Sequence, residues 1–494
     1  MGFLSIDLGT TNIKVAAYGD NLKELSAENC AVNYNRKGKQ VEFDAEKYFA
    51  LVTETMKRCC RGAFSSTPYP LRQVILTGQA ESLVVLGGDM QPLRPAISWM
   101  DMRSGEECTH LEQEFSSEIT YPITGQPAII PTWPITKILW LKKNEPGLFE
   151  KIGHFLLIKD FIQYRLTGVL AGEYSIYNFS HYFNIIEKKY WQEILDFCGV
   201  SHSRLPALVE PCTVLGKISR EIARNLDINQ DAVVNVGTLD HFAGMVGTGN
   251  IREGVVSEST GTVMSIAALL SQPLFSPGRI PCHYGPFKDS YVILPVVESG
   301  GVCLEWLRDH FLPDLSFDQI NQELSKRELP NDLLFLPYLT GVNAPDFNVN
   351  AKGVFYGIRL DHDQMDFAAA VMEGLAHILK KNMAQMEKAG IPVEYIISTG
   401  GGARSDVWSR IKAGVTGREV QVPANPEAAC LGSAIIGAVS EGLFASYDEA
   451  VSACVQMEKS FQPADTASFS EKHCLFNLLY RQLKPVFEEN LLES

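Results

Sequence analysis

The chain has 494 residues and a mass of 54.7 kDa, with 46% hydrophobic and 20% charged residues, which excludes a disordered or fibrous protein and predicts about two to four domains. The formal net charge of −15 argues against nucleic acid and anionic membranes as partners. An acid as early as Asp7, scattered cysteines and short apolar runs predict a cytoplasmic protein without a leader or a membrane anchor.

The first predicted element is a β-hairpin with a polar tip. Residues 3–7 are predicted as a buried strand, 9–12 as a tight turn and 13–18 as the returning strand. A glycine followed by hydroxyl residues lets backbone N–H groups approach phosphate oxygens, and Lys14 would add positive charge. Asp7 would hold Mg²⁺ through water. Taken alone, the turn is more typical of an ordinary hairpin turn with a surface aspartate.

A polar cluster flanks an apolar strand predicted over residues 83–86. Its members are Gln79, Glu81, Trp99, Asp101 and Arg103. Sugar sites combine an aromatic wall with amide and carboxylate groups, because hydroxyls need both donors and acceptors. The alternative is a capped strand with a surface ion pair between Asp101 and Arg103.

Near the middle of the chain, residues 233–236 are predicted as a buried strand, followed from Gly237 by a turn that carries Asp240 and by a glycine-rich stretch. Phosphoryl transfer from ATP needs a carboxylate that accepts the alcohol proton, and Asp240 is the candidate. The alternative is that Asp240 caps a helix. His241 either contacts a substrate or packs at the wall of the cleft.

The hairpin pattern then recurs, which predicts two related halves. Residues 255–258 are strand-like, 261–262 form the turn and 263–269 return as an apolar strand. Two such turns in one chain suggest a clamp on a single polyphosphate. The domain boundary is predicted between them, giving domains of residues 1–246 and 247–494.

The C-terminal part contains a long amphipathic helix and a glycine loop. Residues 366–389 have apolar side chains at helical spacing, and 395–398 are predicted as a strand. The turn at 400–402 would admit a flat ligand or a phosphate beside a helix whose N-cap is Ser405 or Asp406. Alternating strands and helices favour an α/β fold.

Together these segments resemble the FGGY family of carbohydrate kinases, members of the actin-like ATPase superfamily. The resemblance runs nearly end to end and rests on residues 7–11, 99–103, 240, 244–249, 259–262, 300–301, 304–308, 351–353 and 400–405. It implies an α/β fold of two actin-like (ribonuclease H-like) domains that flank a catalytic cleft, with ATP and Mg²⁺ as cofactors.

The resemblance and the local patterns together assign a role to each candidate residue. Asp240 aligns with the catalytic base, and Asp7 with Asp240 would serve the metal. The predicted nucleotide contacts are Gly9, Thr10, Thr11, Asn12, Lys14, Gly261, Thr262, Gly301, Gly401, Gly402, Ala403 and Asp406. The predicted substrate contacts are Gln79, Ala80, Glu81, Trp99, Asp101, Thr132, Trp133, Asp240 and His241.

The substrate is predicted only by class. Xylulose kinases usually carry Gln-Met-His at residues 79–81 and glycerol kinases Gln-Arg-Glu, so Glu81 is similar to the glycerol type, whereas 99–101 is similar to ketopentose kinases. We expect phosphorylation of a ketopentose or related ketose, with a polyol of the glycerol or erythritol type, or an aldonate, as alternatives. A non-kinase actin-like ATPase and a homodimer stay open. A nicotinamide dehydrogenase is disfavoured, because no strand precedes GxGxxG.

Overall fold

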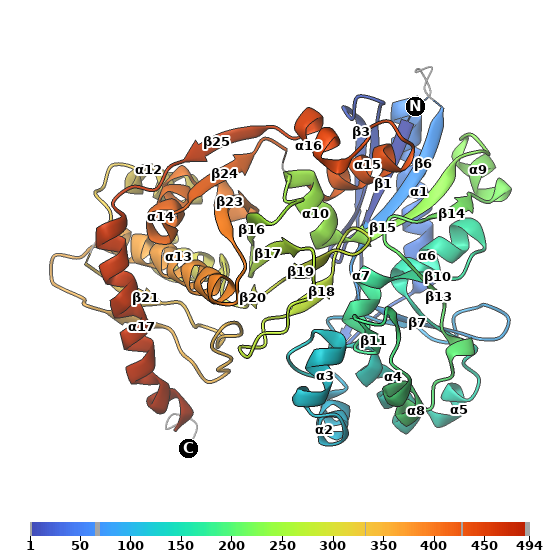
Figure 1. The fold of residues 1–494 in the computed structure, drawn as a ribbon, viewed down its shortest axis with the longest axis horizontal. Coiled ribbons are helices and arrows are strands. Elements are labelled where there is room, and N and C mark those ends of the chain that lie inside the picture. The colour runs from blue at the N-terminus through green and yellow to red at the C-terminus, as the bar shows by residue number, and fades with distance from the viewer. Residues whose placement is uncertain (1, 65–69, 331, 426–427, 490–494) are drawn as a thin grey trace.

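The computed structural model describes residues 2–64, 70–330, 332–425 and 428–489, which form two α/β halves side by side (Figure 1). Each half is built on a mixed β-sheet with helices packed against it. The predicted α/β fold of two sheet-based halves is confirmed.

The N-terminal sheet has six strands in the order β14-β15-β6-β1-β2-β3. Their bounds are β14 Val214–Lys217, β15 Val233–Leu239, β6 Leu71–Gly78, β1 Gly2–Leu8, β2 Asn12–Tyr18 and β3 Glu24–Ala31. Strands β1, β6 and β15 run parallel, and β1 pairs with β2 in the predicted hairpin. Since Asp7 lies opposite Lys14 in this hairpin, both face the same end of the sheet.

The C-terminal sheet has eight strands in the order β18-β19-β17-β16-β23-β24-β25, with β20 paired to β17. Their bounds are β18 Cys282–Tyr284, β19 Tyr291–Ile293, β17 Met264–Leu270, β16 Gly254–Thr260, β23 Val393–Thr399, β24 Glu419–Pro423, β25 Met457–Phe461 and β20 Val296–Val297. The run β17-β16-β23-β24 repeats β2-β1-β6-β15, because a hairpin is again followed by two parallel strands. The predicted second hairpin and the repeat are therefore confirmed.

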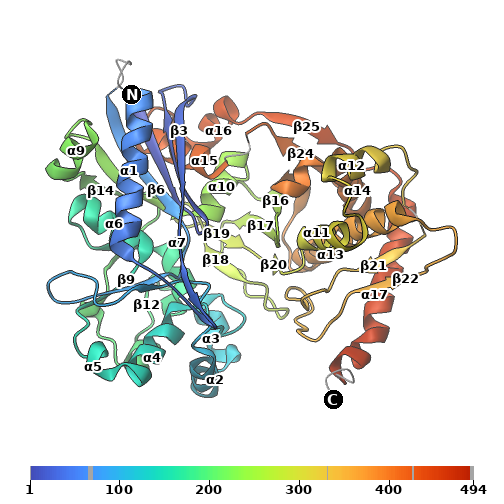
Figure 2. The ribbon, with the colours of Figure 1, turned by 180° about the vertical axis from the view of Figure 1, so that it is seen from behind.

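Helices of the N-terminal half cover one face of its sheet and form a separate lower layer. Figure 2 shows α1 lying over the sheet. The bounds are α1 Ala45–Phe64, α2 Gly105–Glu114, α3 Ser117–Thr124, α4 Pro134–Asn144, α5 Pro146–Phe149, α6 Ile158–Thr167, α7 Tyr174–Tyr177, α8 Gln192–Cys198 and α9 Arg220–Leu226. The lower layer carries short strands at β4 Asn35–Lys37, β5 Gln40–Phe43, β7 Leu83–Leu86, β8 Ala96–Ile97, β9 His154–Leu157, β10 Ala171–Glu173, β11 Phe183–Asn184, β12 Lys189–Tyr190 and β13 Ala207–Val209.

Helices of the C-terminal half pack around the predicted long helix. The bounds are α11 Val302–Phe311, α12 Phe317–Leu324, α13 Gln364–Lys388, α14 Asp406–Thr416, α16 Tyr447–Cys454 and α17 Thr466–Glu488, with a small sheet of β21 Leu334–Leu336 and β22 Val354–Tyr356. The helix predicted over 366–389 is confirmed as α13, whose apolar face is buried. Ser405 caps α14, since its hydroxyl accepts from Trp408 N at 3.1 Å.

Two helices cross where the halves meet, and one of them lies where a turn and a glycine-rich stretch were predicted. Strand β15 continues through Gly237 to Leu239, and the glycine-rich stretch is helix α10 (Asp240–Thr248) rather than a loop. Helix α10 crosses α15 (Ala428–Ser440) so closely that a Cβ on Gly247 would lie 1.8 Å from the Ala428 carbonyl oxygen. Gly247 thus serves helix contact. The domain boundary predicted at 246/247, inside α10, stays a prediction.

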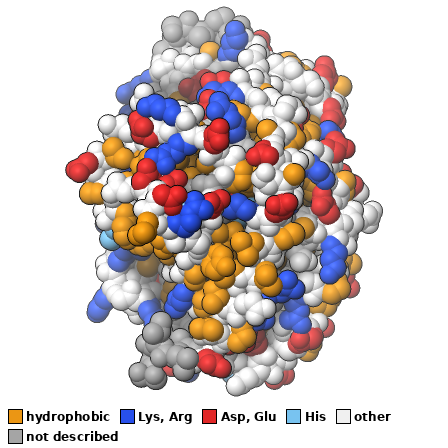
Figure 3. Space-filling model, turned by 90° about the vertical axis from the view of Figure 1, so that its left-hand side faces the viewer, with side chains coloured by type: hydrophobic (Ala, Val, Ile, Leu, Met, Phe, Trp, Pro, Cys, Tyr) orange, Lys and Arg blue, Asp and Glu red, His pale blue; other side chains and the backbone are white. Residues whose placement is uncertain are grey.

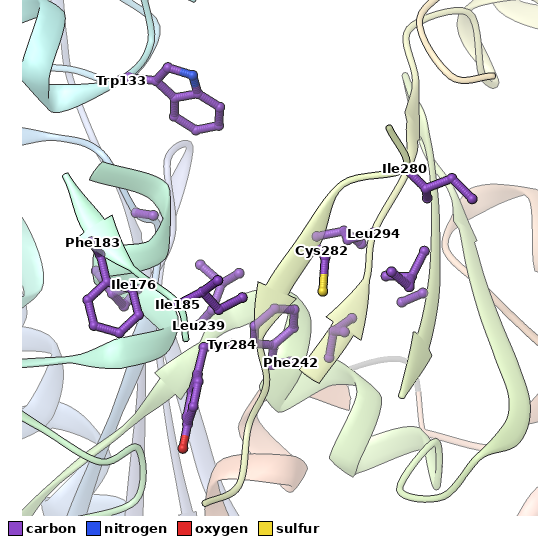
Figure 4. Packing of buried hydrophobic residues seen from close by; sticks show 14 of the residues in the cluster. Trp133, Ile176, Phe183, Ile185, Leu239, Phe242, Ile280, Cys282, Tyr284 and Leu294 are labelled. Carbon is purple, nitrogen blue, oxygen red and sulfur yellow. The ribbon is translucent and has the colours of Figure 1, made fainter. Parts of the chain in front are cut away.

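A shared hydrophobic core ties the lower N-terminal layer to the C-terminal sheet. Figure 4 shows Trp133 and Ile185 on one side and Cys282 and Leu294 on the other, with Phe242 of α10 between them. All five side chains are at most 6% exposed. Since apolar burial is the main favourable term in folding, this core holds the two halves in contact.

The outer end of the C-terminal half shows scattered apolar side chains among mixed charges (Figure 3). Helix α17 exposes Leu475, Leu478 and Val486. Within the described ranges, no helix is both long and apolar enough to cross a membrane.

The helix crossing gives a stability prediction. Gly247→Ala should lower the free energy of unfolding by about 1–3 kcal/mol, because the added methyl overlaps the Ala428 backbone. Gly244→Ala on the same helix is the matched control, since a Cβ there meets no atom within 4 Å. Thermal unfolding of the two variants checks this, and equal unfolding temperatures would contradict the close contact.

Candidate active site

A cleft between the halves gathers residues from both sheets. Its central cavity, of about 300 Å³, is lined by Asp7, Lys14, Asp240 and His241 from the N-terminal half and by Glu258, Ser259, Thr399 and Gly400 from the C-terminal half, among others. The predicted base and the predicted metal carboxylate therefore face one space. Parallel strands end at the same edge of a sheet, which is where α/β proteins collect ligand-binding groups.

The first glycine–threonine turn is held by side chains far from it in sequence. Trp99 donates from Nε1 to Thr10 Oγ1 at 2.8 Å. The Tyr48 hydroxyl and Gln79 Nε2 donate to the Gly9 carbonyl oxygen at 3.2 and 3.4 Å. Two predicted substrate residues, Gln79 and Trp99, thus hold the first glycine–threonine turn in place. Tyr48 gave no sequence signal, because it lies in an ordinary amphipathic helix.

The remaining residues of this turn take simpler places. Thr11 is exposed, and its carbonyl oxygen accepts from Val32 N at 2.9 Å. Asn12 is the first residue of β2. Their predicted contacts with a nucleotide stay predictions.

The second turn rests on a buried ionic network. Lys412 is paired with Glu258 Oε1, and the two side chains are 1% and 0% exposed. Glu258 Oε2 accepts from Thr260 Oγ1 at 2.6 Å, and Lys412 also donates to Ser398 Oγ at 3.1 Å. Because a buried charge must be paired and hydrogen-bonded, this network fixes the strand end that leads into Gly261.

An adjoining cavity of about 650 Å³ lies on the C-terminal side. It brings together five predicted nucleotide residues, namely Gly261, Thr262, Gly301, Gly401 and Gly402. Gly301 N donates to the Gly261 carbonyl oxygen at 2.7 Å, which joins two of these loops. Two other predicted contacts do not line it: Ala403 is 6% exposed, and Asp406 pairs with Lys459 at 2.9 Å.

Several further residues line this cavity that were not predicted as nucleotide contacts, although Arg308 lies in the segment 304–308 that carries the family resemblance. They include Arg308, Phe317, Asn321 and Trp408. Phe317 and Trp408 offer aromatic surface to a flat ring, while Arg308 offers positive charge. Only the fold brings them together, since they come from α11, α12 and α14.

On the opposite side, Glu81 forms a polar cluster with Thr132. The Thr132 hydroxyl donates to Glu81 Oε1 at 3.3 Å, and buried Lys137 donates to the Thr132 carbonyl oxygen at 2.6 Å. Burial raises the pKa of Glu81, and the nearby Asp240 carboxylate raises that pKa further, whereas Lys137 lowers it. Burial also lowers the pKa of Lys137. The three ionisable groups are therefore close enough to share one electrostatic environment.

The ion pair between Asp101 and Arg103, named as an alternative, is present, but it is buried and does not lie on the surface as expected. Its side chain is 0% exposed and that of Arg103 is 4% exposed, with Arg103 Nη2 2.7 Å from Asp101 Oδ2. Asp101 Oδ2 also accepts from Val41 N at 2.6 Å, and Oδ1 accepts from Arg103 N at 3.0 Å. The carboxylate is thus engaged within the protein, and its predicted contact with substrate stays a prediction that this geometry does not favour.

Trp133 and Ala80 lie below the surface of this region. Both are 6% exposed, and Trp133 Nε1 donates to the Ala128 carbonyl oxygen at 3.0 Å. The Trp133 ring stacks on His181 with centroids 6.1 Å apart. Neither ring nitrogen of His181 has a hydrogen-bond partner among the described residues. Burial lowers the pKa of His181 to about 3.

A larger cavity lies elsewhere among the described residues. It has a volume of about 810 Å³ and opens between residues 32–35, β5 and α1, with Tyr34, Phe43 and Tyr48 in its wall. None of the predicted site residues lines it. We therefore place the candidate active site in the smaller cavities of the cleft.

Comparison with known proteins identifies both halves. Residues 3–247 match the N-terminal domain, and residues 259–441 the C-terminal domain, of the FGGY family of carbohydrate kinases. Xylulose kinase of Staphylococcus epidermidis is 27% identical over 490 residues, covering 98% of this chain and 96% of that protein. Gluconokinase of Bacillus subtilis is 27% identical over 501 residues, covering 98% and 94%. A crystal structure of ligand-bound xylulose kinase from Lactobacillus acidophilus has the same fold, with a TM-score of 0.92, 24% identity and 99% coverage of both chains.

Buried His181 gives a pH prediction. The unfolded chain protonates this imidazole below about pH 6.5, whereas the folded protein keeps it neutral down to about pH 3. Stability is therefore present above pH 6.5 and lost as the pH falls. In His181→Phe, unfolding should become less acid-sensitive by about 1.4 kcal/mol per pH unit between pH 6 and 4. Denaturation at several pH values measures the free energy of unfolding of both proteins, and their difference at pH 8 gives the effect of the substitution that does not depend on pH. If the free energies of unfolding of the two proteins changed in parallel between pH 6 and 4, the prediction would be contradicted.

Proposed function

The chain belongs to the FGGY family of carbohydrate kinases, and from that premise we propose that it transfers the γ-phosphoryl group of ATP to a hydroxyl of a ketopentose or related ketose. One observation carries this proposal, namely that a single cavity is lined by both halves. Asp7, Asp240 and His241 line it from the N-terminal half, and strand β16, which leads into the second glycine–threonine turn, lines it from the C-terminal half. A phosphoryl donor held by the C-terminal half would meet an acceptor held by the N-terminal half.

Asp240 acts as the general base in this proposal. It is the first residue of α10 and lies half-buried at the edge of the cavity. A carboxylate at this point can accept the proton of the attacking hydroxyl, while backbone N–H groups of the two glycine–threonine turns hold the phosphates. Movement of the halves about the α10 and α15 crossing would exclude water, which competes as a nucleophile.

Two carboxylates fit a magnesium site. Asp7 and Asp240 line the same cavity, and Mg²⁺ is commonly held by one or two carboxylates together with water and substrate phosphates. The ion supplies charge neutralisation on the transferred phosphoryl group. Lys14, opposite Asp7, adds positive charge at the same edge.

The acidic setting of the sugar side favours a neutral substrate. The Asp240 carboxylate raises the pKa of Glu81, so an aldonate would bring a third carboxylate close to both. A ketose hydroxyl can instead donate to Glu81 and to Asp240. The likeness to gluconokinase keeps an aldonate as the second candidate, because Lys137 and His241 could counter its charge.

The role of Asp240 gives a catalytic prediction. Asp240→Asn keeps the shape of the side chain but removes the proton acceptor, so kcat should fall at least about 100-fold. Binding of the nucleotide without Mg²⁺, measured by calorimetry, should change little and serves as the control for folding, because the proposed metal role of Asp240 does not enter it. A variant that turns over at close to the wild-type rate would rule out this base.

The substrate class is tested at Glu81. With a ketose, Glu81→Gln should raise KM by roughly 10-fold, because a neutral amide oxygen accepts a weaker hydrogen bond from the sugar hydroxyl than a carboxylate does. With an aldonate, the same change should lower KM, because a like charge is removed. Coupled kinase assays over pentuloses, hexuloses, polyols and aldonates, run on both proteins, separate the two. If Glu81→Gln lowered KM for gluconate and left KM for every ketose unchanged, the assignment of the substrate class would be reversed.

A further inference from the structure

The backbone just before Asp240 is irregular, so the position of that residue is not set by the sheet alone. The pairing of β15 with β6 shifts register between Asn235 and Thr238. Gly237 has φ of +59°, and a Cβ there would lie 1.9 Å from the Leu76 carbonyl oxygen. A bulge of this kind re-aims the residues that follow it. Other contacts must therefore fix the strand end.

Two side chains donate hydrogen bonds to the carbonyl oxygen two residues before Asp240. The Thr238 carbonyl oxygen accepts from Lys159 Nζ at 3.1 Å and from Thr77 Oγ1 at 2.9 Å. Thr77 is fully buried, and Lys159 is 1% exposed. Both of that oxygen's lone pairs are thus used, which restricts rotation of the peptide group.

Lys159 is itself held by a buried carboxylate. Its Nζ lies 3.0 Å from Glu173 Oε1, and both side chains are 1% exposed. Glu173 also accepts from Ser175 N at 2.6 Å and from Ile176 N at 3.2 Å. Each member of the pair therefore has hydrogen bonds beyond the ion pair itself. Since desolvation largely offsets the attraction within such pairs, the geometry that it imposes matters more than its net stabilisation.

Ser175 connects this pair to the residue that immediately precedes the predicted base. Its hydroxyl donates to Glu173 Oε1 at 2.9 Å and accepts from Leu239 N at 3.1 Å. Leu239 is the N-cap of α10 and supplies no side-chain cap of its own. The start of α10 is thus held from outside, by Ser175.

We propose that Lys159, Ser175 and Thr77 are positioning residues that hold the start of α10, so that Asp240 stays in line with the acceptor hydroxyl. This inference rests on the proposed role of Asp240. A misplacement of about 1 Å at a reacting group can cost on the order of 100-fold in rate. None of the three residues lines the central cavity, so each acts through Asp240 and not on the substrate.

The C-terminal half also contains a buried lysine–glutamate pair next to a cleft segment, which supports the positioning role proposed here. There, buried Lys412 and Glu258 hold Thr260, which leads into the second glycine–threonine turn. Each half thus places a lysine–glutamate pair beneath the segment that it contributes to the cleft. The two pairs act on different partners, the base in one half and the phosphate turn in the other.

The experiment compares variants that differ by single hydroxyl groups. Ser175→Ala and Thr77→Val each remove a contact to the strand end, and Thr77→Ser keeps the hydroxyl. Ser409→Ala is the matched control, because it removes a buried hydroxyl that has no partner among the described residues. Steady-state kinetics with ATP and D-xylulose, or the best sugar of the panel, are measured beside thermal unfolding and Asp240→Asn.

We expect kcat to fall about 10- to 100-fold in Ser175→Ala and Thr77→Val, with KM for ATP and for the sugar within about twofold of wild type. Thr77→Ser and Ser409→Ala should keep kcat. Lower unfolding temperatures with unchanged kcat, or a loss carried by KM alone, would overturn the positioning role. If Asp240→Asn is inactive while Ser175→Ala and Thr77→Val are fully active, only this inference is overturned. If Asp240→Asn is active, the role of Asp240 as the base is overturned, and this inference with it.

Discussion

Helices α10 and α15 cross where the halves meet, at a separation that leaves no room for side chains at Gly247 and Gly432. An added Cβ at either glycine would lie 1.8 Å from a carbonyl oxygen of the other helix. Helix α15 belongs to the C-terminal half by sequence yet packs on the N-terminal sheet, with Gly437 against Phe3 and Ile75. The halves are therefore interleaved at this crossing.

This crossing also determines where the chemistry can occur. Helix α10 carries Asp240 at its first turn and the tight contact at its last, so the position of the candidate base depends on both halves. A change in the angle between the halves would move the second turn relative to Asp240. Such motion about a close-packed contact is the usual means by which two-lobed enzymes assemble a site only when substrate is present.

Buried ionic groups surround the cleft, and each has a distinct task. Lys159 with Glu173 and Lys412 with Glu258 are buried ion pairs with further hydrogen bonds, and each pair contacts a segment that reaches the cleft. Glu81 lies nearer the substrate side, where the pKa of its carboxyl group is raised by burial. Fully paired charges impose geometry, whereas a carboxyl group of raised pKa keeps hydrogen-bonding capacity for a ligand. The proposed roles follow this difference, with the paired groups positioning the cleft segments and Glu81 contacting the substrate.

Local patterns in the sequence determined the two glycine–threonine hairpins, helix α13 and the cap at Ser405, because these features depend on side-chain period and on hydrogen bonds between near neighbours. The motif matches also led to the family, through a resemblance that spans both halves. The turn expected at Gly237 became a bulged strand, since pairing with β6 continued past it.

Only the tertiary structure decided which side chains meet at the cleft. Trp99 contacts Thr10 across 89 residues, and Lys412 contacts Glu258 across 154. It also decided that Asp101 is buried against Arg103 and that Gly247 serves helix packing. Such contacts depend on how sheets and helices pack over long separations in the chain, and no local period of apolar residues encodes them.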